Sequence, residues 1–226
     1  MPTRGQAQLA IWSDIEPELE TDYLHWLTRE HVLERVGVDG FLSGRVFRSE
    51  VAGKRRFFIT YELQEADALA GPSYLARLNA PTPWSQRVMP ILQNFARGGG
   101  PVVARAGLGC GAVALPLRLD LETAGLLNED AQKALVERIA QLDAVAQVWL
   151  MRVDAAATGV PTREKSMRRS VEGAFDGVLV IEALHDAAAR AAVDGLLLAE
   201  LASADVPDRQ VFAACFQLDR RLAGLS

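Results

Sequence analysis

The sequence predicts an α+β protein built from two fused ferredoxin-like repeats, each with the element order β-α-β-β-α-β and an antiparallel sheet. The main observation is that strand-like and helix-like apolar patterns follow one another in the same order twice, with the second copy starting near Leu108. The chain of 226 residues is also long enough for two small domains. We therefore expect one repeat in residues 1–105 and the other in residues 106–226.

The first repeat begins with a strand-like run and a long helical pattern. At about 100° per residue, an apolar stripe runs along this helix, as expected of a helix that packs on a sheet. The stripe contains Leu19, Tyr23, Trp26, Leu27 and Leu33. The predicted elements are strand Gln8–Ser13, helix Glu16–Arg35, strands Phe41–Arg48 and Phe57–Leu63, and then a second helical stretch and another extended segment.

Both faces of the strand Phe57–Leu63 are largely apolar. Since side chains alternate along a strand, we expect one face to contact helices and the other to contact the sheet of the second repeat within the same chain. The second repeat is rich in Ala, Leu and Val and is interpreted as a scaffold. Its predicted elements are strand Gly111–Leu119, helix Glu129–Leu142, strands Gln147–Val153 and Gly177–Leu184, helix Ala187–Ala202 and strand Gln210–Leu218.

Two connecting segments carry unusual compositions. The glycine triplet before Pro101 matches no phosphate-binding fingerprint, so a loop or bulge in the strand that closes the first repeat is expected at Gly98–Pro101. The segment 155–174 contains a basic run from Arg163 to Arg169 and is much longer than its counterpart near Val51–Lys54. It is expected to be mobile and solvated; the alternative is a functional lid.

Composition excludes several classes of partner. The net charge of −5 provides no basic surface for nucleic acid, and no apolar run approaches the length of a membrane helix. Met1–Gln6 is too short for a secretory signal, so we expect a cytoplasmic protein. Cys110 and Cys215 are expected to be small buried thiols. No metal site is predicted, because no histidine has a Cys or His partner at ligand spacing.

Polar chemistry is concentrated in the first repeat. Trp, Tyr and His combine an apolar body with a polar tip, which suits a ligand pocket. Glu30 projects from the apolar stripe of the first helix and His31 lies on its flank. A buried carboxylate must be paired or have a raised pKa, so Glu30 is either paired with Arg45 or Arg48 or acts as a pocket acid or base. His31 is either structural or pocket-lining.

The first half also resembles a known family. The stretches Trp12-Ser13-Asp14, Tyr23–Trp26, Glu30–Arg35 and Gly40–Leu42 are similar to the first half of EthD-like dimeric α/β-barrel proteins. The later stretch Pro81–Arg87, ending in Asn94-Phe95, is similar to uncharacterised members of that group. The resemblance covers residues 8–97; in the second half only strand order and length match.

The resemblance implies a fold in which two ferredoxin-like sheets form a dimeric-α/β-barrel-like structure, here within one chain. It implies binding of a small apolar or aromatic molecule, with cofactor-independent oxygenase, isomerase or cyclase activity in a degradation pathway. The alternative is a non-catalytic binding or assembly module with a filled core. No cofactor is expected, and His31 in the charged segment Arg29–Arg35 is a poor axial ligand for the haem branch. Chains of this type can assemble further as homo-oligomers.

The candidate site follows from both lines of argument. His31 and Glu30 are the candidates for general base, and four aromatic side chains are expected to line the cavity. These are Trp12, Trp26, Tyr61 and Trp84.

Overall fold

The computed structural model describes residues 4–168, 175–194 and 209–224, and its strands pair in antiparallel fashion. The chain divides into two compact units. The first unit comprises residues 1–100, 154–174 and 215–226, and the second comprises residues 101–153 and 175–214. Each unit therefore draws on separated stretches of the chain. The two-repeat organisation with a boundary at residue 105 stays a prediction.

The first unit contains a sheet in the hydrogen-bonded order β4-β1-β3-β2-β8, where β4 and β8 contribute their residues up to 100 and from 215 onwards. Its central pairs run in register from Ala7↔Leu63 to Ile15↔Arg55 for β1 and β3, with a bulge at the start of β2. The strands are β1 (Ala7–Ile15), β2 (Phe41–Val51), β3 (Lys54–Leu63), β4 (Gln93–Gly107) and β8 (Phe212–Asp219).

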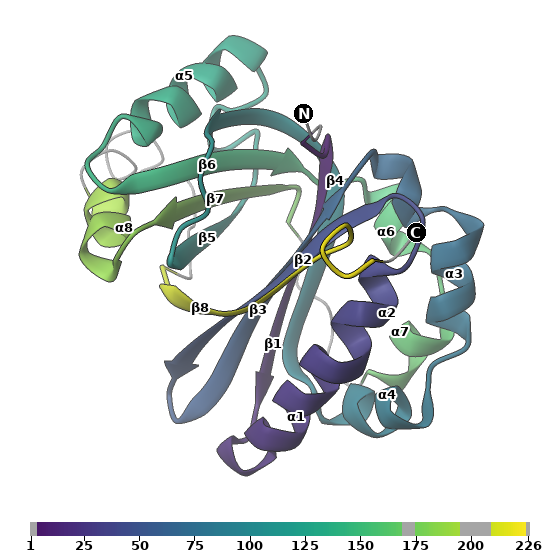
Figure 1. The fold of residues 1–226 in the computed structure, drawn as a ribbon. Coiled ribbons are helices and arrows are strands. Elements are labelled where there is room, and N and C mark those ends of the chain that lie inside the picture. The colour runs from purple at the N-terminus through teal and green to yellow at the C-terminus, as the bar shows by residue number, and fades with distance from the viewer. Residues whose placement is uncertain (1–3, 169–174, 195–208, 225–226) are drawn as a thin grey trace. The chain divides into compact units, whose positions relative to one another are not determined.

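The helices of the first unit gather on one side of this sheet (Figure 1). The first long helix is continuous but has three parts, because a π-helical segment separates two α-helical ones. The helical elements are η1 (Pro17–Leu19), α1 (Glu20–Trp26), η2 (Leu27–His31), α2 (Val32–Val36), η3 (Ala66–Leu69), α3 (Pro72–Asn79), α4 (Pro83–Val88), η4 (Met89–Ile91), α6 (Ala155–Gly159) and α7 (Arg163–Met167).

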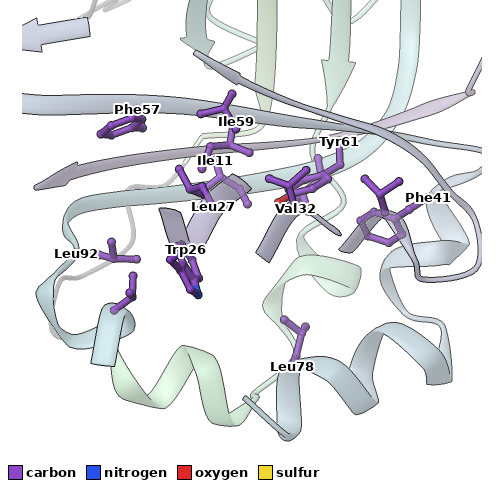
Figure 2. Close-up of a cluster of buried hydrophobic side chains, with 14 of the residues drawn as sticks. Ile11, Trp26, Leu27, Val32, Phe41, Phe57, Ile59, Tyr61, Leu78 and Leu92 are labelled. Carbon is purple, nitrogen blue, oxygen red and sulfur yellow. The ribbon is translucent and has the colours of Figure 1, made fainter. Parts of the chain in front are cut away.

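One apolar core joins helices and sheet in this unit. Leu27 and Val32 on the helix face Ile59 and Tyr61 on β3, whereas Trp26 lies on the side of the helix nearer Leu92 (Figure 2); all five core side chains on the helix and β3 are buried. The expectation that one face of the strand Phe57–Leu63 packs on helices is therefore confirmed. The packing of its other face against a second sheet stays a prediction.

The second unit has a sheet in the order β8-β5-β7-β6-β4 with its own apolar core. β5 pairs with β7 from Val113↔Ala183 to Leu119↔Gly177. Its other elements are β5 (Val113–Leu119), α5 (Glu129–Ala140), β6 (Val145–Arg152), β7 (Gly177–Ala183) and α8 (Asp186–Ala192). Part of the predicted helix Ala187–Ala202 lies outside the described residues.

Several expectations need correction. Gly98–Pro101 lies within the strand β4, so the loop expected there is wrong, and the alternative of a bulge stays a prediction. Cys110 and Cys215 are both exposed, so they are not buried thiols. The part of segment 155–174 that is described, up to Arg168, forms α6 and α7 and buries Glu164, so the expectation that the segment is solvated along its whole length is wrong.

Among the described residues, no helix is long and apolar enough to span a membrane, and no three-residue group suited to a metal ion is present.

The apolar stripe of the first helix is also interrupted. Leu19 and Leu33 are 37% and 39% exposed, whereas His31 and Arg35 are 6% and 2% exposed. The π-helical segment η2 explains the change at Leu33 and Arg35 but not at Leu19, because its extra residue turns the residues beyond it by about 100° relative to a regular α-helix. Leu33 is thereby turned to solvent, and His31 and Arg35 are turned to the core.

Candidate ligand-binding site

A cavity of about 40 Å³ lies within the first unit, between the sheet, the first long helix and helices α6 and α7. This volume is the space open to the centre of a water molecule, and it has room for more than one. Most of the wall is apolar or aromatic. The polar side chains in the wall are those of Tyr23, His31, Arg35, Tyr61, Tyr74, Arg97, Thr158, Thr162, Glu164, Lys165 and Arg168.

His31 is held in the cavity wall by an aromatic stack. Its ring lies 4.1 Å from that of Trp26, centroid to centroid, at an interplanar angle of 29°. The Trp26 ring in turn stacks on Tyr23 at 5.5 Å. The Nδ1 atom of His31 is buried and has no hydrogen-bond partner. Burial, reinforced by the positive charges of Arg35 and Arg168, holds the pKa of His31 well below its ordinary value. His31 is therefore neutral at physiological pH.

Glu30 takes a supporting position beside this stack. Its carboxylate accepts a hydrogen bond of 2.5 Å from Thr82 Oγ1, and Thr82 caps α4 by accepting from the backbone N–H of Ser85. Ser85 Oγ accepts a hydrogen bond of 3.1 Å from Nε1 of Trp26. Glu30 is not in the cavity wall, and it pairs with neither Arg45 nor Arg48. It positions Trp26 through the cap of α4.

Arg35 carries a positive charge into the interior. Its guanidinium donates to Glu164 on α7, with side-chain exposures of 2% and 4% for the two partners. Glu34 lies 3.2 Å from the other terminal nitrogen, although the N–H at that nitrogen is not directed at the carboxylate oxygen. The nearby carboxylates raise the pKa of Arg35 against the opposing effect of burial. The Arg35–Glu164 pair fastens α7 to the first helix.

Two tyrosines and a second arginine complete the polar wall. Tyr61 is 0% exposed, its hydroxyl has no hydrogen-bond partner, and burial raises its pKa. Tyr74 accepts a hydrogen bond of 3.1 Å from Arg97, which also donates to the carbonyl of Thr158 at 3.1 Å. Arg168 lies over the ring of Phe95 at 4.1 Å.

Of the residues expected to line the cavity, the structure brings together His31, Trp26 and Tyr61. Trp12 projects from the opposite face of β1 and packs on Phe58, with ring centroids 4.9 Å apart. Trp84 is half-buried and lies 3.4 Å from Asp22 through its indole nitrogen. Neither Trp12 nor Trp84 is in the cavity wall.

Sequence reasoning missed Arg35, Arg97 and Glu164 as site residues. The i, i+4 spacing of His31 and Arg35 places both on one helix face, which was a usable signal. Glu164 is the one acidic residue in the basic run from Arg163 to Arg169, and that contrast was another. Nothing in the sequence pattern marks Arg97.

A haem group does not fit this cavity. A macrocycle needs several hundred Å³ beside a free ring nitrogen, whereas about 40 Å³ is open here and one face of His31 is covered by Trp26. No step of the chemistry is therefore assigned to haem.

No family model matches the chain, and no curated protein matches it. Several solved structures are similar to it. A provisionally assigned monooxygenase of Fusobacterium nucleatum subsp. nucleatum superimposes with a TM-score of 0.55 at 13% identity, over 96% of each chain. An anthrone oxidase-like protein gives 0.57 at 12%, over 94% of this chain and 93% of its own. A variant of the chlorite dismutase of Candidatus Nitrospira defluvii gives 0.54 at 12%, over 99% and 97%.

At these identities the likeness concerns the fold alone. It extends over nearly the whole chain, so it applies to both units. No comparison supports the EthD-like group in particular. The chain thus shares the mixed α/β fold of these solved structures.

Proposed function

We propose that this protein is an enzyme of oxygenase type that acts on a small, largely apolar or aromatic molecule in the cavity of the first unit. The observation that carries the proposal is the buried, neutral His31 with a free Nδ1 in an aromatic wall. The oxygenase-like names of the structural neighbours and the EthD-like resemblance of residues 8–97 support the same class.

His31 is suited to accept a proton from the substrate. A neutral imidazole with an unoccupied nitrogen acts as a general base, and abstraction of a proton from an enol, phenol or activated C–H is a first step open to cofactor-independent oxygenases, isomerases and cyclases alike. Arg35 lies on the same helix face as His31, but its charge is already balanced by Glu164, so no role in stabilising the resulting anion is assigned to it. Glu30 acts only by positioning Trp26.

The test is a thermal-shift screen with phenols, aromatic acids and quinones, followed by assays of oxygen consumption and product formation for compounds that stabilise the protein. Since general-base catalysis contributes about 10²–10⁴-fold, His31→Gln should lower turnover by that factor while the circular dichroism spectrum is unchanged. His25→Gln is the matched control, because His25 is half-buried on the same helix and outside the cavity wall.

Two results would contradict the proposal. One is full turnover by the His31→Gln protein. The other is the absence of any stabilising compound in the screen, which would favour the non-catalytic binding or assembly module. The small volume of the cavity is the observation on the side of that alternative.

A further inference from the structure

The charges in the cavity wall are strongly unbalanced. Four cationic side chains, those of Arg35, Arg97, Lys165 and Arg168, face a single carboxylate, that of Glu164. Arg35 is the side chain that Glu164 neutralises. Arg97 makes no ion pair with this carboxylate, and its own contacts are of a different kind.

Arg97 is a cationic side chain of the wall whose hydrogen-bond acceptors are both uncharged. It is half-buried on β4, and its two hydrogen bonds run to neutral oxygens, the carbonyl of Thr158 and the hydroxyl of Tyr74. In the described part of the chain, no carboxylate lies within 4.0 Å of its guanidinium. A guanidinium has five N–H donors, so donors remain after these two bonds.

Tyr61 provides a second, independent observation. Its hydroxyl is fully buried at the cavity and has no partner, although buried polar groups in proteins are nearly always hydrogen-bonded. The wall thus offers the hydroxyl donor of Tyr61 and the remaining N–H donors of Arg97, while its one carboxylate is already engaged by Arg35. What this set lacks is an acceptor with negative charge.

We propose that the cavity binds a monocarboxylate with an apolar body, whose carboxylate is held by Arg97 and Tyr61. The apolar body would lie against the wall formed by Leu69, Leu75 and Leu78. This inference rests on the proposed function, because it names the ligand class of the same cavity. A carboxylate satisfies both observations at once, since charge-assisted hydrogen bonds to guanidinium and hydroxyl donors are the strong ones.

The experiment compares benzoate with benzamide, which has nearly the same shape and no charge. Binding to the full-length protein is measured by titration calorimetry and by the fluorescence of Trp26, the tryptophan in the cavity wall. We expect benzoate to bind about 10-fold or more tightly than benzamide. Arg97→Gln should remove most of this preference, and Tyr61→Phe should reduce it several-fold.

Controls separate charge from folding. Arg87→Gln makes the same change at an exposed position and should leave the preference intact. Arg97→Lys should restore part of the preference, and melting curves establish that each variant is folded. Tyr61→Phe removes only an oxygen atom, so it tests the proposal even if Arg97→Gln fails to fold.

Equal binding of benzoate and benzamide would overturn the proposal, as would failure of both to bind. If the two bind equally and His31→Gln still abolishes turnover of a screened substrate, the proposed enzyme survives and the carboxylate subsite does not. If benzoate is preferred and His31→Gln is fully active, the subsite survives and the general base does not.

Discussion

At the scale of single residues, Arg35 and Glu164 form a buried ion pair that holds α7 against the first helix. Both side chains are almost completely removed from solvent, and they join the first helix to a segment 129 positions away in the sequence. Taking two charges out of water is costly, so such a pair adds modest net stability, but the loss of either partner leaves an uncompensated charge. The pair therefore determines whether α7 stays in place over the cavity.

Glu164→Gln should lower the free energy of unfolding by about 3–5 kcal/mol, because Arg35 would then be buried with only the carboxylate of Glu34, to which its N–H is not directed. Urea denaturation followed by circular dichroism measures the change. The control is Arg190→Gln, which breaks an exposed pair with Asp186 whose side chains are 53% and 58% exposed. A change within about 0.5 kcal/mol is expected there. Equal small effects in both variants would show that Arg35 is not held by Glu164.

His31 makes stability depend on pH in a defined direction. Burial lowers its pKa in the folded state, so below the ordinary value of 6.5 the unfolded chain binds a proton that the folded protein does not. The contribution is complete above pH 6.5 and is lost as the pH falls from there towards the lowered folded pKa. The slope for one proton is about 1.4 kcal/mol per pH unit.

The comparison of wild type with His31→Gln between pH 7.5 and about 5.5 isolates this effect. We expect wild-type stability to fall more steeply with decreasing pH than that of the variant. Glu34 acts in the opposite sense, because burial raises its pKa, but it is present in both proteins and cancels in the difference. Parallel curves for the two proteins would mean that His31 is accessible to protons in the folded state.

At the scale of secondary-structure elements, the π-helical segment η2 determines which polar side chains of the first helix reach the cavity. By adding one residue to a turn, it brings His31 and Arg35 to the core side and turns Leu33 to solvent. π-Helical turns are rare, and a regular helix would place Glu30 centrally on the apolar face. The identity of the polar groups at the cavity thus depends on this one extra residue.

Deletion of Arg29, an exposed residue within η2, should restore a regular helix and rotate α2 by about 100°. Arg35 would leave Glu164, so we expect a loss of about 3–5 kcal/mol in unfolding free energy with helix content retained. Arg29→Ala keeps the chain length and should change stability by no more than about 0.5 kcal/mol. A deletion variant as stable as the substitution would show that the π turn has no structural role.

At the scale of the whole molecule, the two compact units do not correspond to the two halves of the polypeptide. The first unit takes residues 154–174 and 215–226 in addition to residues 1–100, and these later segments supply α6, α7 and part of β8. The wall of the cavity includes Glu164 and Thr158, which are far along the sequence from His31. Neither half of the polypeptide contains the complete site.

A fragment of residues 1–105 should therefore aggregate or form a homodimer. It would bury Arg35 without Glu164 and expose the apolar side chains that α6 and α7 cover. Light scattering and amide proton dispersion measure the outcome, and co-expression with residues 106–226 should restore a soluble product. A well-dispersed monomer of the fragment alone would contradict this division of the chain.

The sequence by itself determined the order of the elements and much of the core. Short apolar runs predicted the strands within Ala7–Ile15, Phe41–Val51 and Lys54–Leu63, because strands buried on both faces have largely continuous apolar sequences. Aromatic enrichment pointed to the first half and to Trp26, Tyr61 and His31, which line the cavity. These predictions depend on local periodicity, which a sequence displays directly.

Only the tertiary structure decided which polar groups meet. Because of the π-helical segment η2, His31 and Arg35 line the cavity in place of Glu30. The packing of α7 against the first helix brings Glu164 to Arg35. Trp12 went to the other face of β1, away from the cavity. Such pairings join residues far apart in the sequence or depend on one extra residue in a turn. Apart from the i, i+4 spacing of His31 and Arg35, these pairings leave no periodic pattern in the sequence. The free energy that selects them comes from burying charges together and exists only once the chain has folded.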